Sequence, residues 1–139
     1  MVALVLCATG CTAPALTEGA YRSDALRSAT ELLSAVRTGV LAAELAEDGK
    51  AFTPYLDVTA TDAEDTARSV SDTFGTLQPP SPGLDGLRRR ITALGDDAVG
   101  GLSDLRVAVR RGDRAGTQEA ARALRDTARG LADVEESLR

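Results

Sequence analysis

The sequence predicts an all-α protein, an antiparallel up-down-up-down four-helix bundle over residues 18–139. Apolar residues recur at steps of three and four along four segments, the spacing that places them on one face of a helix. Short stretches with proline or glycine separate these segments, and no segment alternates as a half-buried strand would. With only two Phe, two Tyr and no Trp, the core must consist of Leu, Val, Ile and Ala, which suits closely packed helices.

The first helix is predicted from near Ala20 to near Asp48, with Gly49 as its stop signal. Its apolar stripe is Ala25, Ala29, Leu32, Val36, Val40 and Ala43, widened by Leu26, Leu33 and Leu41. The second helix is predicted to begin at Thr53-Pro54, where the threonine is the N-cap and the proline the first helical residue. Its stripe is Leu56, Ala60, Ala63, Ala67, Val70, Phe74 and Leu77.

The segment Gln78-Pro79-Pro80 ends the second helix, because successive prolines remove backbone donors and favour extended conformations. Ser81-Pro82 then repeats the cap-and-proline start for a third helix. Its stripe is Leu84, Leu87, Ile91, Leu94, Ala98, Leu102, Leu105 and Val109. Glycines between Gly95 and Gly101 cost about 1 kcal/mol each relative to alanine. We expect a continuous helix whose glycines permit close packing, and the alternative is a kink.

The third helix is predicted to end at Arg110-Arg111-Gly112, and Asp113 is the predicted N-cap of the fourth helix. The last stripe is Ala120, Leu124, Ala128, Leu131, Val134 and Leu138. Because the connections are short, the four helices must run antiparallel, each about 40 Å long at 1.5 Å per residue.

Residues 1–17 form a predicted leader and linker. Val2 to Thr9 are almost wholly apolar, and the following Gly10-Cys11 ends an export segment with a small residue before cysteine. This apolar run is shorter than the about 20 residues that cross a bilayer, so we do not expect it to span one unless the chain begins upstream. An uncleaved anchor or a frayed leader are the alternatives. No Lys or Arg precedes the apolar run, so we expect the true start to lie upstream.

Ala8-Thr9-Gly10-Cys11 resembles the lipobox of bacterial lipoproteins, with Ala in place of the commoner Leu three positions before the cysteine. The resemblance implies cleavage before Cys11 and a diacylglycerol on its thiol. Cys7 would be lost with the leader, so neither a disulfide nor a redox pair would remain in the mature chain.

The leader also belongs to a wider resemblance. Together with Thr17–Arg22, Pro54–Leu56 and Val70–Phe74 running into Gln78-Pro79-Pro80, it resembles small uncharacterised lipoproteins of high-GC Gram-positive bacteria. This resemblance implies a helical fold and attachment to the outer face of the cell membrane. The family has no assigned activity, so no catalytic residue is implied.

The composition argues against several functions. A formal charge of -5 disfavours nucleic acid, whose binding requires a basic face. Histidine is absent and the one methionine is the initiator, which removes the usual general base, metal ligand and axial haem ligands. We therefore expect no enzyme activity, no cofactor and no metal. Two carboxylates could hydrolyse a glycoside, but a narrow bundle lacks the cleft for a sugar ring.

Two basic motifs have both a functional and a structural interpretation. Arg88-Arg89-Arg90 could bind an anionic partner such as a phospholipid headgroup. Consecutive helix residues point about 100° apart, however, so a solvated face with Asp85 pairing to Arg88 or Arg89 is favoured. Arg111-Gly112-Asp113 matches the adhesion tripeptide recognised by integrins, but it also supplies the cation, glycine and acid of a helix turn, which we favour.

Acidic groups could supply oxygen ligands to Ca²⁺ or Mg²⁺, but no EF-hand pattern is present, so surface pairing, for example with Arg68, is favoured. These groups are Asp62, Glu64 and Asp65, then Asp96-Asp97, then Glu44, Glu47 and Asp48. Tyr21 and Tyr55 could rim a pocket or a partner surface. We favour residues at the edge of the core with solvated hydroxyls.

The leading hypothesis is a binding or structural module that Cys11 tethers to the membrane and that presents a helical face to an envelope protein. It predicts an exposed apolar strip on the packed bundle. The alternative is a carrier of a small ligand or ion within the bundle, which requires polar residues on the inner stripes. Thr127 is the clearest such residue. An enzyme that acts through carboxylates is the least favoured hypothesis.

Overall fold

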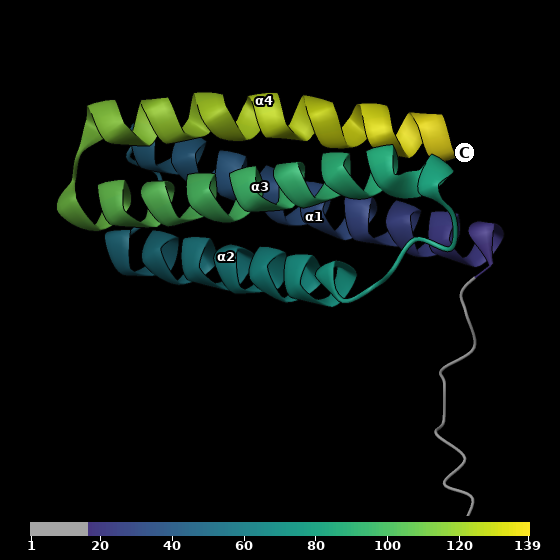
Figure 1. Ribbon diagram of the computed structural model, residues 1–139. Helices are drawn as coiled ribbons and strands as arrows, with labels where there is room; N and C mark the ends of the chain where they lie inside the picture. Colours follow the sequence, from purple (N-terminus) through teal and green to yellow (C-terminus); the bar gives the residue numbers. More distant parts are fainter. Residues whose placement is uncertain (1–16) are drawn as a thin grey trace, which may run out of the picture.

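The computed structural model describes residues 17–139, and every regular element in this range is helical. The elements are α1 (Glu18–Glu47), α2 (Thr53–Gly75), a 3₁₀ turn η1 (Pro82–Leu84), α3 (Asp85–Arg111) and α4 (Arg114–Leu138). The helices run up, down, up and down, so that the start of α1 and the end of α4 lie at the same end of the bundle (Figure 1). The predicted antiparallel four-helix bundle is confirmed.

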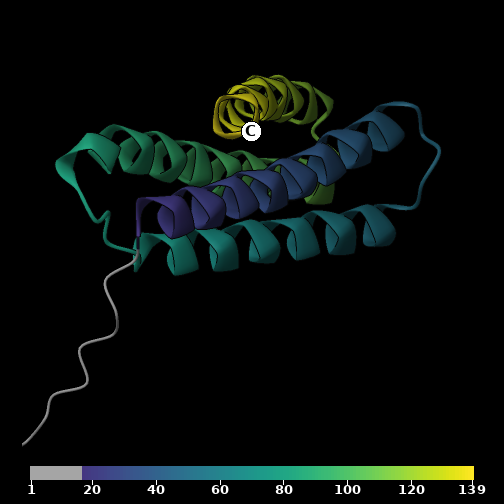
Figure 2. The same cartoon turned by 90° about the vertical axis from the view of Figure 1, so that its right-hand side faces the viewer.

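The four helices form a rhombus rather than a square in cross-section. Each helix packs against its neighbours in sequence, α4 returns to α1, and α1 also contacts α3 across the diagonal. The central pair α1 and α3 separates α2 from α4, which lie on opposite sides (Figures 1 and 2). In Figure 2, α4 is seen nearly end-on while the other helices are seen from the side, so α4 crosses them obliquely.

Glycines of the central pair allow the neighbouring helices to approach closely. A Cβ atom on Gly101 of α3 would lie 2.9 Å from Leu124 Cδ2, and one on Gly95 would lie 2.5 Å from Ser71 Oγ. On α1, Gly39 faces Leu102, which is fully buried. Because α3 runs unbroken through both of its packed glycines, the predicted continuous helix is confirmed.

Helix ends follow the sequence signals in most places. The Thr17 side chain accepts a hydrogen bond from the Ala20 N–H, at 3.2 Å, and caps α1. Gly49 and Gly112 adopt the left-handed conformation, each with φ of 64°; Gly112 directly follows α3, and Gly49 follows Asp48, the C-cap of α1. This conformation is easy for glycine and lets the following amide groups bond to the last carbonyl groups of the helix.

Two predicted helix starts are wrong in detail. Thr53 is already helical, and the preceding Phe52 occupies the N-cap position without a side-chain hydrogen bond. Ser81-Pro82 opens the 3₁₀ turn rather than α3. The Ser81 hydroxyl group donates to Glu18 Oε1 on α1, at 2.6 Å, and accepts no capping hydrogen bond from the turn that follows it.

The predicted apolar stripes face the interior with one exception. The largest fully buried side chains come from α1, α2, α3 and α4, among them Leu32, Phe74, Leu102 and Leu131. Leu41, which we expected to widen the stripe of α1, is 55% exposed. It lies on the outer face of that helix, so the prediction for Leu41 is wrong.

The leader lies outside the described residues, and with it lie Cys7 and the predicted lipidation site Cys11. No helix in the described part of the chain is both long and apolar enough to cross a membrane.

Candidate functional site

An open groove runs between α1 and α2 on the outside of the bundle. It has a volume of about 540 Å³, and small side chains line much of it. Its lining consists of Glu31, Ser34, Ala35 and Thr38 from α1 and Tyr55, Val58, Thr59, Asp62, Ala63 and Thr66 from α2. These positions follow the helical steps of three and four, so both helices present one continuous face to the groove.

Large apolar side chains are exposed at one end of this groove. Phe52 is 85% exposed, Tyr55 61% and Val58 57%. Tyr55 and Val58 line the groove from the first turns of α2, Phe52 is the N-cap residue just before this helix, and we call these three residues the apolar strip. Single exposed apolar residues are ordinary on protein surfaces, whereas neighbouring ones on one helix indicate an interaction surface.

The groove is acidic because of two carboxylates. Glu31 of α1 and Asp62 of α2 line it, and no arginine or lysine is among its lining residues. Within the described residues, neither carboxylate forms an ion pair, whereas the nearby acids Asp24 and Glu64 do. The groove therefore combines negative charge with exposed apolar surface.

The threonines of the groove already use their donor hydrogens. Thr38 Oγ1 donates to the Ser34 carbonyl at 3.0 Å, and Thr66 Oγ1 donates to the Asp62 carbonyl at 2.8 Å. Each bond is made within one helix, four residues back. A molecule that covers the groove therefore need not supply acceptors for these hydroxyl groups.

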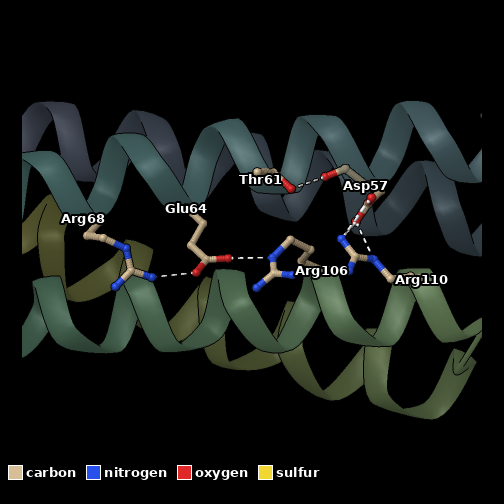
Figure 3. Close-up of polar contacts among 6 residues, drawn as sticks. All are labelled: Asp57, Thr61, Glu64, Arg68, Arg106 and Arg110. Atoms are coloured by element: carbon tan, nitrogen blue, oxygen red, sulfur yellow. Dashed lines mark hydrogen bonds and ion pairs between the residues drawn. The ribbon is translucent and has the colours of Figure 1, made fainter.

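A second polar site joins α2 to α3. Glu64 is only 6% exposed and lies between two arginines (Figure 3). Arg68 Nη2 donates to Glu64 Oε1 at 2.7 Å, and Arg106 Nε donates to Glu64 Oε2 at 2.8 Å. The hydrogen bond and the negative charge of Glu64 raise the pKa of Arg106, so this arginine stays charged.

One turn further along α3 and two turns back along α2, Asp57 and Arg110 form a further link between the same helices. Arg110 Nη2 lies 3.0 Å from Asp57 Oδ1 and 3.2 Å from Asp57 Oδ2 (Figure 3). Thr61 Oγ1 donates to the Asp57 carbonyl at 2.8 Å. Every carboxylate in this network already has a cationic partner, so its chemistry is that of a fixed connection between α2 and α3 rather than of proton transfer.

This network corrects the prediction for the acidic group at residues 62–65. We expected surface pairing of Asp62 and Asp65 with Arg68. Arg68 bonds to Glu64 instead, and Glu64 is buried against α3. Glu64 lies beside the buried alanines of α2, Ala60, Ala63 and Ala67, and bonds to Arg106 of α3 and to Arg68 of its own helix.

Tyr21 also departs from the prediction of a solvated hydroxyl group. Its side chain is fully buried, and its ring centroid lies 5.8 Å from that of Phe74. The hydroxyl oxygen is buried without a hydrogen-bond partner. Burial raises the pKa of Tyr21, opposed by the positive charge of Arg88. Tyr55, by contrast, is exposed and lines the groove.

The three consecutive arginines point in different directions, as predicted. Arg88 donates to the Gln78 side chain at 3.0 Å and to the Gly75 carbonyl at 3.2 Å, which closes the end of α2. Arg90 lies 3.7 Å from Asp133 of α4, and Arg89 is exposed. No ion pair joins Asp85 to Arg88 or Arg89 in the structure, so that detail is wrong.

The tripeptide Arg111-Gly112-Asp113 forms the α3–α4 turn. Gly112 is in the left-handed conformation, and Asp113 Oδ1 accepts from the Gly116 N–H at 3.0 Å as the N-cap of α4. The structural interpretation of this motif is confirmed.

The remaining acidic candidates do not converge. Glu44 pairs with Arg125 at 3.0 Å and Asp48 with Lys50 at 2.7 Å, while Asp96 and Asp97 are exposed on α3. Among the described residues no three side chains are grouped to hold a metal ion. Thr127 is buried, but its hydroxyl group donates to the Ala123 carbonyl at 3.1 Å within α4. The donor hydrogen of Thr127 is therefore already used within α4.

Phe52 and Val58 are not among the candidate site residues predicted from the sequence. Both are large apolar residues that lie outside the predicted inner stripe of α2, three residues before and three residues after Tyr55. A search for apolar residues outside the stripes would have found the apolar strip.

Comparisons of the chain with known protein families, with curated proteins and with solved structures find no match.

Proposed function

We propose that this chain is a lipid-anchored binding module on the outer face of the cell membrane. In this proposal Cys11 carries the lipid, and the bundle presents the α1–α2 face to another protein of the envelope. The lipobox-like segment that ends at Cys11 supports the anchor. The anchor alone would give the protein a location, and the exposed face would give it an activity.

The apolar strip is the observation that carries the proposal. Its three side chains are each more than half exposed, although burying one such side chain is worth about 1.5–3 kcal/mol. A monomer with no partner gains nothing from displaying them side by side. A surface that covers them on binding gains this energy at the moment of association.

The position of the strip suits a tethered protein. The strip lies at the start of α2, at the end of the bundle opposite the start of α1 (Figures 1 and 2). The 30 residues of α1 correspond to about 45 Å at 1.5 Å per residue. The seven residue steps from Cys11 to Glu18 could add up to about 25 Å when extended. A lipid at Cys11 would thus leave the strip within reach of proteins well above the membrane surface.

The test is to crosslink the full chain in the cells that produce it. A photoreactive amino acid would replace Tyr55 in one variant and the exposed Glu119 of α4 in a control. We expect a protein adduct from position 55 that position 119 does not give. Mass spectrometry of the N-terminal peptide should show a diacylglycerol on Cys11.

Two results would contradict the proposal separately. Unmodified Cys11 in a chain recovered from the soluble fraction would exclude the lipid anchor. Identical adducts from positions 55 and 119 would show that the α1–α2 face is not preferred, and would exclude the binding surface.

A further inference from the structure

The α1–α2 groove has the dimensions of one short helix. From Tyr55 to Thr66 the groove follows α2 for about 16 Å, or three helical turns, at 1.5 Å per residue. Its floor consists mostly of alanine, serine and threonine. Small floor residues allow a third helix to approach two packed ones, as a ridge enters a groove. Three turns provide the anchors at positions i, i+3 or i+4, and i+7 that helix-in-groove recognition uses.

The charge of the groove restricts which helix it accepts. Glu31 on one wall and Asp62 on the other have no cationic partner in the described chain. Four other surface depressions each include an arginine, namely Arg114, Arg88, Arg27 and Arg111. Glu31 also borders the depression that contains Arg27, but Arg27 pairs with Asp24. The complement of the α1–α2 groove is therefore a surface that carries cations beside apolar side chains.

We propose that the α1–α2 groove binds a basic amphipathic helix of a partner protein. Leucine-like side chains of that helix cover the apolar strip, and its Lys or Arg side chains lie beside Glu31 and Asp62. The proposal rests on the proposed function as a binding module and adds the chemistry of the partner. Charged groups that flank an apolar contact chiefly set specificity and the rate of association.

Two other occupants fit the groove less well. An anionic phospholipid surface would meet the two unpaired carboxylates of the groove as like charges. A second copy of the chain also has a formal net charge of -5. Its most exposed apolar side chains flank the same acidic groove. Two copies would therefore bring like charges together.

The experiment measures binding of a synthetic peptide to the full chain by fluorescence anisotropy. The probe is a fluorescein-labelled amphipathic helix of about 18 residues, above the length at which isolated helices become marginal. Leucines line one face of this peptide and lysines flank them. A second peptide has glutamate in place of every lysine.

We expect the lysine peptide to bind at least about tenfold more tightly than the glutamate peptide, since two ion pairs are gained and two repulsions avoided. The double variant Glu31→Gln/Asp62→Asn should lose about tenfold in affinity for the lysine peptide, and Tyr55→Ser/Val58→Ser should lose at least as much. The matched control is Asp104→Asn/Glu119→Gln, which removes two exposed carboxylates from the α3–α4 depression and should retain the affinity.

Several results would overturn the proposal. Equal losses in the groove variant and the control would mean that the peptide merely senses net charge. Equal affinity for the lysine and glutamate peptides would exclude a basic helix as the preferred partner. If the chain binds phosphatidylglycerol vesicles and Tyr55→Ser/Val58→Ser abolishes this binding, the strip is a membrane contact. If the chain dimerises in ultracentrifugation and the same variant abolishes dimerisation, the strip binds a second copy. Thermal unfolding of each variant, followed by circular dichroism, shows that it is folded.

Failure here is distinguishable from failure of the proposed function. A lipid on Cys11 and a specific adduct at position 55, without binding of the lysine peptide, would leave a tethered module with a different kind of partner. Peptide binding by a chain without a lipid on Cys11 would support the groove as a binding site and exclude the lipid tether.

Discussion

Two neighbouring glycines of α3 allow a sharp test of the packing. Gly100 is exposed, and a Cβ atom built on it meets nothing within 4 Å. A Cβ atom on Gly101 would lie 2.9 Å from Leu124 Cδ2 and 3.2 Å from Leu124 Cγ, and Leu124 is fully buried. Alanine at the two positions therefore changes the same helix by the same group, once towards solvent and once into the core.

The expected free energies have opposite signs. Gly100→Ala should stabilise the fold by about 1 kcal/mol, because alanine has the higher helix propensity. Gly101→Ala gains the same propensity, but overpacking of a filled core costs about 1–3 kcal/mol. The two variants should thus differ by about 1–3 kcal/mol in the free energy of unfolding, with Gly101→Ala the less stable.

Differential scanning calorimetry of the two variants and the parent chain measures this difference. For a domain of this size, each 1 kcal/mol corresponds to about 3–5 °C in Tm, so the gap between the variants should be about 3–15 °C. Urea titration gives an independent value. Equal Tm values, or a loss of stability in Gly100→Ala, would refute the close contact between α3 and α4 at this level.

Three further predictions concern the polar groups of the bundle. Glu64→Gln should lower the free energy of unfolding in urea by about 1–3 kcal/mol, less than the about 3–5 kcal/mol of a fully buried pair, because its partner Arg68 is half exposed. Asp126→Asn, at an exposed ion pair, should cost under about 0.5 kcal/mol. Equal costs for the two variants would contradict the network. Tyr21→Phe should stabilise the fold at pH 7 by about 1 kcal/mol or more, since it removes a buried hydroxyl group without a partner. Because folding raises the pKa of Tyr21 above 10.0, its neutral form contributes stability that is intact below pH 10 and is lost as the pH rises through the raised pKa. The parent chain should therefore lose stability above pH 10 more steeply than Tyr21→Phe, and parallel pH profiles of urea unfolding would refute this. Asp113→Ala should cost about 1 kcal/mol through loss of the N-cap of α4, measured by the same titration, and an unchanged midpoint would show that the cap contributes nothing.

The fold could be predicted from the sequence because its signals are local. The apolar period of each helix, the glycine after α1 and the Gly112-Asp113 turn each depend on a few neighbouring residues, so a short stretch of sequence is enough to recognise them. The errors at Ser81 and Thr53 both concern where a helix begins, and neither side chain caps the helix that follows it. Ser81 has the sequence of an N-cap, yet its hydroxyl group bonds to Glu18, which is distant in sequence and adjacent only in the folded bundle.

The candidate site was less predictable for the same physical reason. The burial of Glu64 depends on Arg106 of another helix, and its own neighbours in sequence resemble an ordinary surface turn. The groove arises from two helices that meet only after folding, so Glu31 and Asp62 could not be placed on facing walls in advance. What the sequence did predict is the kind of surface to look for, an apolar strip left exposed by the packed helices.

The rhombic packing has a consequence for how such a protein can change over generations. Since α1 and α3 hold α2 and α4 apart, a substitution on the outer face of α2 needs no matching substitution in α4. The helices of the central pair, by contrast, each pack against the three other helices, so their inward-facing positions should tolerate little change. Related proteins with this packing could therefore acquire new partners through α2 alone, and their sequences should vary most at the positions of the apolar strip.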